Sequence, residues 1–258
     1  MISGLVDSHA HLGLDRLYGD IDEVLRRAAD AGVSGMVTIG IDLAQAQRAV
    51  AIAERYPHVR AAVGFHPHNA SQADDDSLAE MERLARRPRV VGYGEIGLDF
   101  HYDYSPRDVQ RAVYRRQIEL GKALGLPLII HLREAYDEGL RLLEEAAPFP
   151  AAGVIHCFSG TEDDARRALD IGFCLSFPGT LTFKNADGLR TIAASLPGDR
   201  ILLETDCPFL APVPLRGKTN EPSFMVHTAQ TLADLRWDGD LERTTAATTA
   251  NAARLFCL

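Results

Sequence analysis

An alternation of short apolar runs with amphipathic stretches, repeated eight times, leaves this chain few ways to fold. The apolar runs are residues 5–9, 35–41, 59–66, 90–98, 127–132, 153–158, 173–177 and 201–206. Their mostly continuous apolar character is typical of strands that are buried on both faces of a parallel sheet. The stretches between them have helical periodicity, as in residues 22–31, which Gly32 ends.

Eight strand-helix units predict an α/β fold, namely a (β/α)8 TIM barrel. An open doubly wound sheet is the alternative. The length of 258 residues fits one such unit, and no linker or change of composition divides the chain. We therefore expect a single domain over residues 1–258. In a barrel the catalytic groups lie at the C-terminal ends of the strands and in the loops that follow.

Two tetrapeptides are expected to begin helices. In residues 105–108, Ser105 precedes Pro106, and proline is favoured at the first helical position. In residues 161–164, Thr161 precedes three acidic side chains, which is typical of a capped helix start.

Two histidines, His9 and His11, stand two residues apart where the first apolar run ends. In an extended strand, residues i and i+2 face the same way, so both imidazoles can reach one cation. Histidine is the commonest metal ligand near neutral pH. Taken alone, the pair also fits two solvated polar side chains, so the other strand ends decide between the interpretations.

Metal-ligating residue types recur at those strand ends. Together with the histidine pair they make six residues at five strand ends: His9, His11, Glu95, His131, His156 and Asp206. Four imidazoles and two carboxylates suit two divalent cations, Zn²⁺ first, or Mg²⁺ or Mn²⁺ where water completes the coordination. We expect Glu95, the ligand type at the fourth strand end, to bridge the two cations.

The expected chemistry is hydrolysis. Two cations would convert a bound water to hydroxide and polarise the bond under attack. Asp206 is placed to orient that water and accept its proton, so Asp206 and Glu95 are the expected catalytic residues. The formal charge of −9, from 36 acidic and 27 basic residues, argues against a basic-patch nucleic-acid binder. The cations would nevertheless make the site locally positive, so an anionic substrate can bind there.

His66 and Arg133 lie on the same side of the expected barrel and are candidates for substrate contact. His66, in the loop after the third strand, would contact a phosphate or leaving group, or would order its loop. The Arg133 guanidinium suits a phosphate, or forms a salt bridge to Glu134 or Glu138. His68 is a weaker candidate of the same kind.

Alternation along the strands also predicts the direction of three side chains close to the ligands in sequence. Glu204 shares a face with Asp206, which suits a third metal or an auxiliary base, or else a barrel-interior carboxylate paired with an arginine or lysine. Cys157 and Cys207 each follow a ligand directly, so alternation turns both away from the cations and toward the helices. We interpret the two cysteines as structural.

Longer motifs surround these residues: DSHAHL at 7–12, GFHPH at 64–68, GEIGLDFHYD at 94–103, PLIIHLREA at 127–135, HCFSG at 156–160 and ETDCPFLAPVPLRGKTNEP at 204–222. In these motifs, which span nearly the whole chain, the sequence resembles the TatD-related metal-dependent deoxyribonucleases, a branch of the amidohydrolase-like barrels. The resemblance implies a TIM barrel, the same six metal ligands, and hydrolysis of phosphodiesters in DNA, typically as a 3'-to-5' exonuclease.

One departure from the family pattern falls near the expected substrate. Family members often carry a basic residue directly before Asn-Glu-Pro, and Thr219 stands there in this chain. A missing charge at that point weakens phosphate contacts. Arg216 and Lys218 remain, and Arg216 joins Arg133 as an expected phosphate contact.

The expected function is metal-dependent hydrolysis of phosphodiester bonds, with single-stranded DNA ends as the substrate. Residues 1–12 lack the basic region and apolar run of a secretory signal, and the four cysteines lie far apart, so we expect a cytoplasmic protein with reduced thiols. No apolar run is long enough to span a bilayer, and no obligate protein partner is indicated.

Two alternatives remain open. The same metal site would serve an amide, ester or lactone substrate, as in other amidohydrolase-like barrels, because the fold does not decide the substrate. Alternatively, the protein binds a nucleic-acid end or a partner and holds metal only structurally. Protein ligands would then fill every coordination position of the metal and leave none for water. Six ligands for two cations leave open positions, which disfavours this second alternative.

Overall fold

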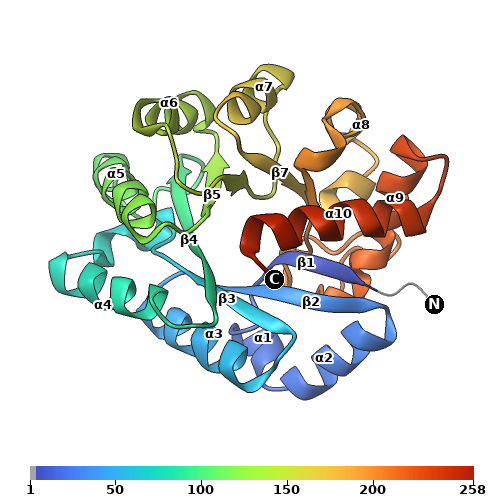
Figure 1. The fold of residues 1–258 in the computed structure, drawn as a ribbon, viewed down its shortest axis with the longest axis horizontal. Coiled ribbons are helices and arrows are strands. Elements are labelled where there is room, and N and C mark those ends of the chain that lie inside the picture. The colour runs from blue at the N-terminus through green and yellow to red at the C-terminus, as the bar shows by residue number, and fades with distance from the viewer. Residues whose placement is uncertain (1–3) are drawn as a thin grey trace.

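Eight parallel strands follow one another around a barrel in chain order in the computed structural model, which describes residues 4–258 (Figure 1). The strands are β1 (Leu5–Ala10), β2 (Val33–Gly40), β3 (Val59–Val63), β4 (Val90–Asp99), β5 (Leu128–Arg133), β6 (Gly153–Ile155), β7 (Cys174–Phe177) and β8 (Ile201–Leu203). The predicted (β/α)8 barrel is therefore confirmed. Residues 1–3 of the predicted domain lie outside the described residues.

Each strand is followed by at least one helix, and the helices surround the barrel (Figure 1). They are α1 (Asp15–Tyr18), α2 (Ile21–Asp30), α3 (Leu43–Arg55), α4 (Asp75–Ala85), α5 (Arg107–Leu124), α6 (Tyr136–Ala146), α7 (Glu162–Asp170), α8 (Asp187–Ser195), α9 (Met225–Arg236) and α10 (Leu241–Phe256). Across residues 4–258, no helix combines the length and the apolar character that crossing a membrane requires.

Several strands end at other residues than their apolar runs predict. β3 ends at Val63, β6 at Ile155 and β8 at Leu203. His156 and Asp206 consequently lie in the loops just after the strands and not on them. The backbone turns there, because Cys157 and Asp206 adopt left-handed φ angles of 46° and 53°. His9 and His131, by contrast, lie inside β1 and β5, shortly before the ends.

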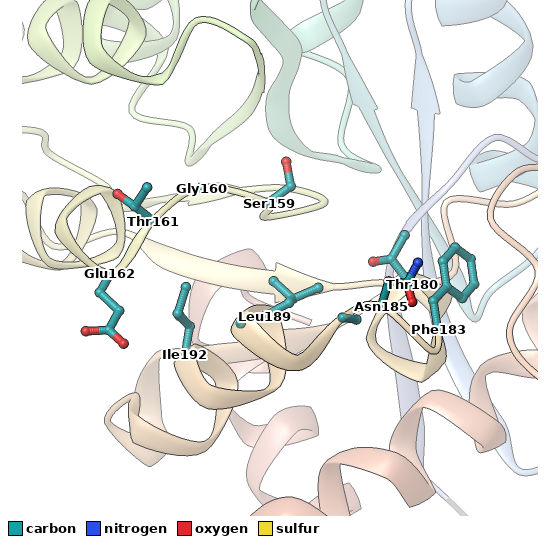
Figure 2. Close-up of a pocket in the computed structure, with 11 residues that line it drawn as sticks. Ser159, Gly160, Thr161, Glu162, Thr180, Phe183, Asn185, Leu189 and Ile192 are labelled. Carbon is teal, nitrogen blue, oxygen red and sulfur yellow. The ribbon is translucent and has the colours of Figure 1, made fainter.

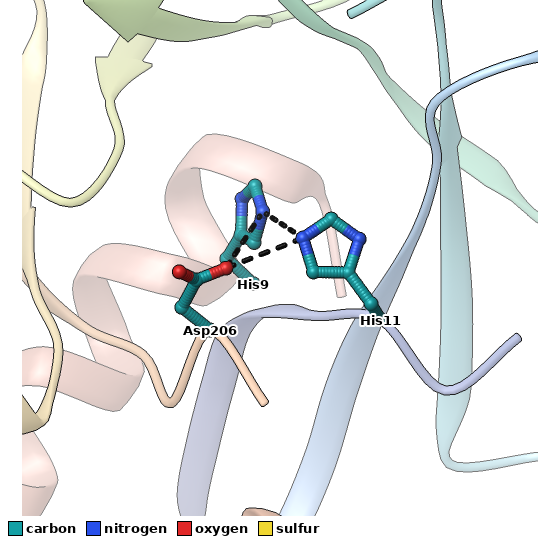
Figure 3. A group of neighbouring side chains, drawn as sticks. All are labelled: His9, His11 and Asp206. Carbon is teal, nitrogen blue, oxygen red and sulfur yellow. Dashed lines mark hydrogen bonds and ion pairs between the residues drawn. The ribbon is translucent and has the colours of Figure 1, made fainter. Parts of the chain in front are cut away.

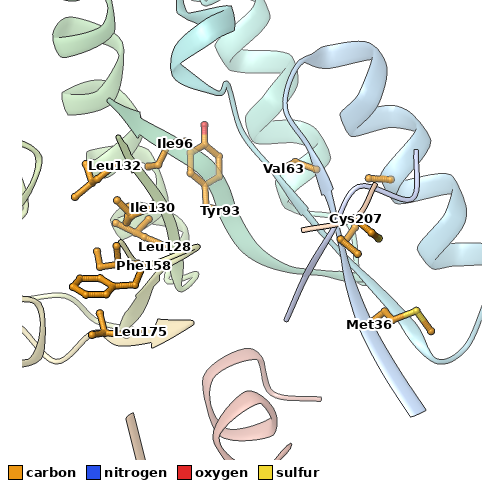
Figure 4. Packing of buried hydrophobic residues seen from close by; sticks show 14 of the residues in the cluster. Met36, Val63, Tyr93, Ile96, Leu128, Ile130, Leu132, Phe158, Leu175 and Cys207 are labelled. Carbon is orange, nitrogen blue, oxygen red and sulfur yellow. The ribbon is translucent and has the colours of Figure 1, made fainter. Parts of the chain in front are cut away.

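Apolar side chains fill two layers, one on each side of the barrel wall. The outer layer packs the strands against the helices and includes Val63, Leu128 and Phe158 (Figure 4). The inner layer takes the opposite faces of the strands: Val6, Val37, Ile39, Ala62, Ile129, Val154, Cys174 and Leu202. Phe256 of α10 joins this inner layer, and Asn251 of the same helix donates to the carbonyl of Ile201, at the start of β8, and to that of Gly198 just before it. α10 therefore closes the barrel at the end opposite to the expected ligands.

The two expected helix starts have different outcomes. At α7, Thr161 and Asp164 exchange side-chain and backbone hydrogen bonds, which confirms the capped start. At α5, Pro106 is the N-cap residue and not the first helical residue, and Ser105 does not cap the helix. Ser105 is fully buried beneath the loop after β3, so its hydroxyl donates to the His68 carbonyl instead (2.9 Å).

Candidate metal centre

The barrel closes where β8 meets β1, and this seam brings the first ligands together. The Ser8 hydroxyl donates to the carbonyl of the last residue of β8 (2.9 Å). The buried Asp7 carboxylate accepts from the backbone N–H and the hydroxyl of Thr205 (2.9 and 2.6 Å), and burial raises the pKa of Asp7 to about 7. Just beyond, the Asp206 N–H donates to the His9 carbonyl (2.9 Å). The Asp206 carboxylate thus lies beside the His9 imidazole.

His9, His11 and Asp206 form the first group of candidate ligands (Figure 3). His9 Nε2 lies 3.3 Å from His11 Nε2, which lies 3.2 Å from Asp206 Oδ1. The third side of the triangle, from His9 Nε2 to Asp206 Oδ1, measures 3.8 Å. Tetrahedral ligands at normal zinc distances lie about 3.3 Å from one another, so two of the three separations match that spacing and the third is wider.

Glu95 reaches the centre of the barrel because β4 is interrupted beside it. The pairing of β4 with β5 shifts between Gly94 and Ile96, so Glu95 bulges out of the ladder. Gly94 and Gly97 have φ angles of 147° and 150°, which side chains with a Cβ rarely adopt. A Cβ at either position would overlap a backbone carbonyl of β5. The two glycines therefore let the strand aim one buried carboxylate inward.

Four imidazoles lie within 3.3 Å of the Glu95 carboxylate, and a fifth, that of His11, lies 3.7 Å from it. Its Oε1 lies 2.8 Å from His131 Nδ1, 2.8 Å from His156 Nε2 and 3.3 Å from His66 Nε2. Its Oε2 lies 3.3 Å from His9 Nε2. Glu95 therefore belongs to two groups of candidate ligands, one with His9 and His156 and one with His66 and His131.

The surroundings set the protonation of this cluster. Burial favours neutral Glu95, but the imidazoles around it hold its pKa well below the usual range. The hydrogen bond from His11 likewise lowers the pKa of Asp206 against the effect of burial. Burial lowers the pKa of His66 to about 4 and also lowers that of His9. Burial lowers the pKa of the three other imidazoles, but the carboxylates that face them raise it more, so the net shift is upward. These imidazoles are those of His11, His131 and His156. Ionised carboxylates and neutral imidazoles bind cations, so these three must be deprotonated on binding.

The donor set fits divalent cations better than it fits a hydrogen-bond network. The Nδ1 atoms of His9, His11 and His156 are buried and have no hydrogen-bond partner among residues 4–258. The Nε2 atoms of His9 and His11 instead face each other across 3.3 Å. One N–H could bridge these two nitrogens, but Glu95 Oε2 and Asp206 Oδ1 also lie within 3.8 Å of both, and a cation accepts a lone pair from each of these atoms.

A second carboxylate of β4, that of Asp99, contacts the His131 ring at the nitrogen that does not face Glu95. Asp99 was not among the residues expected from the sequence. Asp99 Oδ2 lies 3.1 Å from His131 Nε2 and 2.9 Å from His68 Nε2. These contacts hold the pKa of Asp99 well below its usual range, against the effect of burial. Glu95 and Asp99 are four residues apart, and this even spacing is the sequence signal that places both carboxylates on one strand face.

Glu204 is fully buried and binds the loop after β6. Its Oε1 accepts from the Cys157 N–H (2.6 Å) and its Oε2 from the Ser176 hydroxyl (2.5 Å). Oε1 also lies 3.5 Å from His156 Nδ1. The pairing with arginine or lysine that was one alternative is not formed among residues 4–258, because these neutral donors occupy the carboxylate.

A cavity of about 560 Å³ opens over the cluster, and His66 lines it. Cys157 lines it as well, so the prediction that this thiol faces the helices is wrong. The prediction assumed strand alternation, which ends where the backbone of Cys157 becomes left-handed. Cys207 is buried in the outer apolar layer, as expected.

Arg133 stands at the wall of the same cavity, with its guanidinium carbon 4.8 Å from the centre of the Tyr102 ring. The alternative salt bridges to Glu134 or Glu138 are not formed in the described part of the chain. Those carboxylates pair with a histidine and with another arginine. The Arg133 guanidinium is therefore available to an anion.

A second hollow, of about 610 Å³, adjoins the first at Ser159 and Thr180 (Figure 2). It lies between the loop after β6 and α8. Phe183 lines it, and the Arg216 guanidinium carbon lies 3.7 Å from the centre of that ring. Arg216 thus stands beside this second hollow and does not line the cavity over the cluster.

Comparisons with known proteins show which family this chain is similar to. A family model described as TatD related DNase matches residues 6–257. A Bacillus subtilis protein named uncharacterized metal-dependent hydrolase YabD is 41% identical over 252 residues, 98% of each chain. The 3'-5' ssDNA/RNA exonuclease TatD of Erwinia tasmaniensis is 37% identical over 260 residues, which cover 98% of this chain and 100% of that protein. The solved structure of YJJV, a TatD homologue from Escherichia coli K12, has a TM-score of 0.94 at 32% identity, with 100% of both chains covered.

Proposed function

Because this chain belongs to the TatD-related DNase family and is a metal-dependent hydrolase of ester bonds, we propose that it is a 3'-to-5' exonuclease acting on single-stranded DNA ends. We also propose that two divalent cations serve the reaction, Zn²⁺ or alternatively Mg²⁺ or Mn²⁺. One observation carries the proposal. Glu95 stands between two groups of candidate ligands, one with His9 and His156 and one with His66 and His131. A carboxylate in that position can bridge two cations.

The substrate is inferred from the Erwinia relative, which is named a 3'-5' ssDNA/RNA exonuclease and aligns with 98% of this chain. The cavity over the cluster supports this inference. Its volume of about 560 Å³ is in the range of small-molecule sites and accommodates a nucleotide. The free guanidinium of Arg133 at its wall suits a phosphate.

The residues of the site take distinct roles in this proposal. The residues that would hold the cations are His9, His11, Glu95, His131, His156 and Asp206. Bound cations would lower the pKa of a water molecule and polarise the phosphodiester. Asp206 lines the cavity and is kept ionised beside His11, so it orients the water and accepts its proton.

Three residues are proposed to contact the substrate. Arg133 holds a phosphate next to the one that is cleaved, and Arg216 holds one farther along the strand, beside the second hollow. His66 contacts the leaving group from the cavity wall, and its place against Glu95 also suits a cation ligand.

We further propose that the enzyme works in the cytoplasm. The four cysteines, Cys157, Cys174, Cys207 and Cys257, are all free thiols. Free thiols persist in a reducing compartment, where disulfides are rare.

The test is hydrolysis of 5'-labelled single-stranded DNA by metal-stripped protein that is re-supplied separately with Mg²⁺, Mn²⁺ or Zn²⁺. We expect stepwise shortening from the 3' end, and only with a cation. Asp206→Asn should lower the rate by about 100-fold or more, since proton transfer is lost. Asp163→Asn, at an exposed carboxylate on α7, is the control and should cleave like the wild type.

Cleavage without any cation, or full activity of Asp206→Asn, would contradict the proposal. Binding of two cations without cleavage of any DNA would also contradict it. That last result would instead indicate an amide, ester or lactone as the substrate of the same site.

A further inference from the structure

Two exposed tyrosines stack on one another and form a wall beside the candidate metal centre. Tyr102 and Tyr104, in the loop after β4, have stacked rings with centroids 5.4 Å apart and planes 7° apart. Their exposed fractions are 40% and 70%, and Tyr102 also lines the cavity over the ligands. Exposed aromatic surface at the edge of a catalytic cavity marks a binding site.

Buried hydrogen bonds fix the loop that carries the tyrosines. Asp99 Oδ1 accepts from the backbone N–H groups of His101 (3.0 Å) and Tyr102 (2.9 Å). At the other end, the Gln110 side chain of α5 donates to the carbonyls of Asp99 (3.0 Å) and Ser105 (2.9 Å). The wall is therefore in place before a ligand arrives, and little ordering entropy is lost on binding.

A guanidinium and an imidazole complete the wall. The Arg133 guanidinium carbon lies 4.8 Å from the centre of the Tyr102 ring, and His68 meets the Tyr104 ring edge to face at 4.8 Å. His68 is held by Asp99, the carboxylate that also holds His131 of the candidate centre. An aromatic face beside a free cation is how proteins bind the bases and the backbone of single-stranded nucleic acid.

We propose that Tyr102 and Tyr104 form a base-stacking platform, on which a nucleobase of the substrate stacks while Arg133 binds an adjoining phosphate. The proposal rests on the nuclease function proposed above and names the part of the nucleic acid that this wall binds. Every base has a π face, so the platform accepts all bases. It requires an unpaired base, which is a physical reason to prefer single strands over duplex.

The second hollow is a weaker location for the base. Within the described chain it is lined by one acidic side chain, Glu162, and by no lysine or arginine. Its aromatic ring, Phe183, is already covered by the Arg216 guanidinium at 3.7 Å. The ring of Tyr104, by contrast, is largely open to solvent.

Abasic oligonucleotides test the platform, because they lack the base and keep the phosphates. We would compare kcat/KM for an oligonucleotide with that for the same strand carrying abasic residues at its last 3' positions. Stacking on an aromatic side chain contributes about 1–3 kcal/mol per base, so the wild type should prefer the intact strand by roughly 5- to 150-fold. Tyr104→Ala and Tyr102→Ala should lose most of this preference, whereas Tyr104→Trp should keep it.

Tyr18 provides a matched control. It is 40% exposed, like Tyr102, and has the Arg48 guanidinium carbon 5.2 Å from its ring centre. It lines a separate hollow with Asp20 and Asp22. Tyr18→Ala should therefore keep the wild-type preference for the intact strand.

A second readout does not depend on hydrolysis. The chain has one tryptophan, Trp237, so Tyr104→Trp adds a second tryptophan fluorophore, which lies at the platform. A phosphorothioate-linked single strand should quench the added emission, and its abasic counterpart should not. A wild type that cleaves both strands equally, or a preference that persists in Tyr104→Ala, would overturn the platform. If no oligonucleotide is cleaved, the nuclease function fails, and quenching alone then decides for or against the platform.

Discussion

His131 is the residue at which the candidate metal centre and the tyrosine wall meet. Its Nδ1 faces Glu95 at 2.8 Å and its Nε2 faces Asp99 at 3.1 Å. A carboxylate on one nitrogen fixes the tautomer of the ring and leaves the other nitrogen free to bind a cation. Asp99 also binds His68, so one buried carboxylate orients both a candidate ligand and the wall beside it.

We expect Asp99→Asn to lower cation affinity or activity by about 10- to 100-fold, because partners of this kind orient the ligand and raise its basicity. The measurements are a cation titration of the metal-stripped protein and kcat/KM on single-stranded DNA. The loss should extend to the preference for an intact over an abasic strand, since Asp99 also holds the Tyr102 backbone. Cation affinity equal to that of the wild type would refute the positioning role.

Glu204 supports a different prediction, about stability. Its two oxygens accept from the Cys157 N–H and the Ser176 hydroxyl in a site without solvent exposure. Glu204→Leu removes both acceptors and leaves the Cys157 N–H and the Ser176 hydroxyl without their partner in a buried site, so the free energy of unfolding should fall by about 1–3 kcal/mol. Urea unfolding checks this. Ser176→Ala, which removes one donor and leaves the other bond, should destabilise less, and the reverse order would contradict the interpretation.

The candidate ligands could be predicted from the sequence because apolar runs mark where strands end, and a polar residue at that point stands out. Asp99 stands in the same motif as Glu95, but its role depends on which nitrogen of His131 faces inward, and no sequence pattern states that. Cys157 was placed wrongly because alternation applies only while the chain is extended; β6 ends at Ile155, and the backbone at Cys157 is left-handed, with a φ of 46°.

At the scale of single elements, the interruption of β4 is the feature on which the position of Glu95 depends. Gly97 has a φ of 150°, and a Cβ there would overlap the His131 carbonyl of β5. We expect Gly97→Ala to lower the free energy of unfolding by about 3 kcal/mol or more, from backbone strain and overpacking together. Chemical denaturation measures it. Gly188→Ala, in α8 with open space around the added Cβ, is the control and should leave stability unchanged or raise it.

The loop after β8 carries Asp206 and is anchored by the Asn-Glu-Pro segment. The Asn220 side chain donates to the carbonyls of Thr205 (2.8 Å) and Phe209 (2.6 Å), and Glu221 pairs with Arg27 of α2 at 2.7 Å. The eightfold alternation of apolar runs and amphipathic stretches predicted the barrel, but these anchors join residues that are far apart in the chain. Periodicity reports local structure only, so contacts of this kind lie beyond it.

We expect Glu221→Gln to destabilise the protein at pH 7 by about 1–2 kcal/mol, because the bond to Arg27 is charge-assisted. Burial opposes ionisation, but Arg27 lowers the pKa of Glu221 below its ordinary value of 4.5. A lowered folded-state pKa contributes stability above the unfolded pKa and loses it as the pH falls through the folded pKa. The difference between variant and wild type should therefore shrink below about pH 4.5. Denaturation midpoints against pH would show this, and a difference independent of pH would contradict it. Glu23→Gln, at an exposed pair on α2, should leave stability unchanged.

Across the whole molecule, the distribution of charge decides how a polyanion is bound. The formal net charge is −9, and many helix arginines are already paired with carboxylates, as Arg83 is with Glu80 and Arg166 with Asp163. The field of the protein at a distance is therefore negative and repels DNA. Attraction must come from the mouth of the barrel, where Arg133 forms no ion pair with any of residues 4–258 and the candidate ligands would hold cations.

We therefore expect weak binding of a phosphorothioate-linked single strand to metal-stripped protein, and tighter binding once a divalent cation is added. Fluorescence anisotropy in rising KCl measures both states. Each contacted phosphate of a single strand contributes about −0.7 to the slope of log K against log salt, so Arg133→Gln should make the slope shallower by about 0.7. Arg83→Gln, at a paired arginine on α4, should leave the slope unchanged. Tight binding without a cation would mean that the protein itself supplies the anion site, contrary to its net charge.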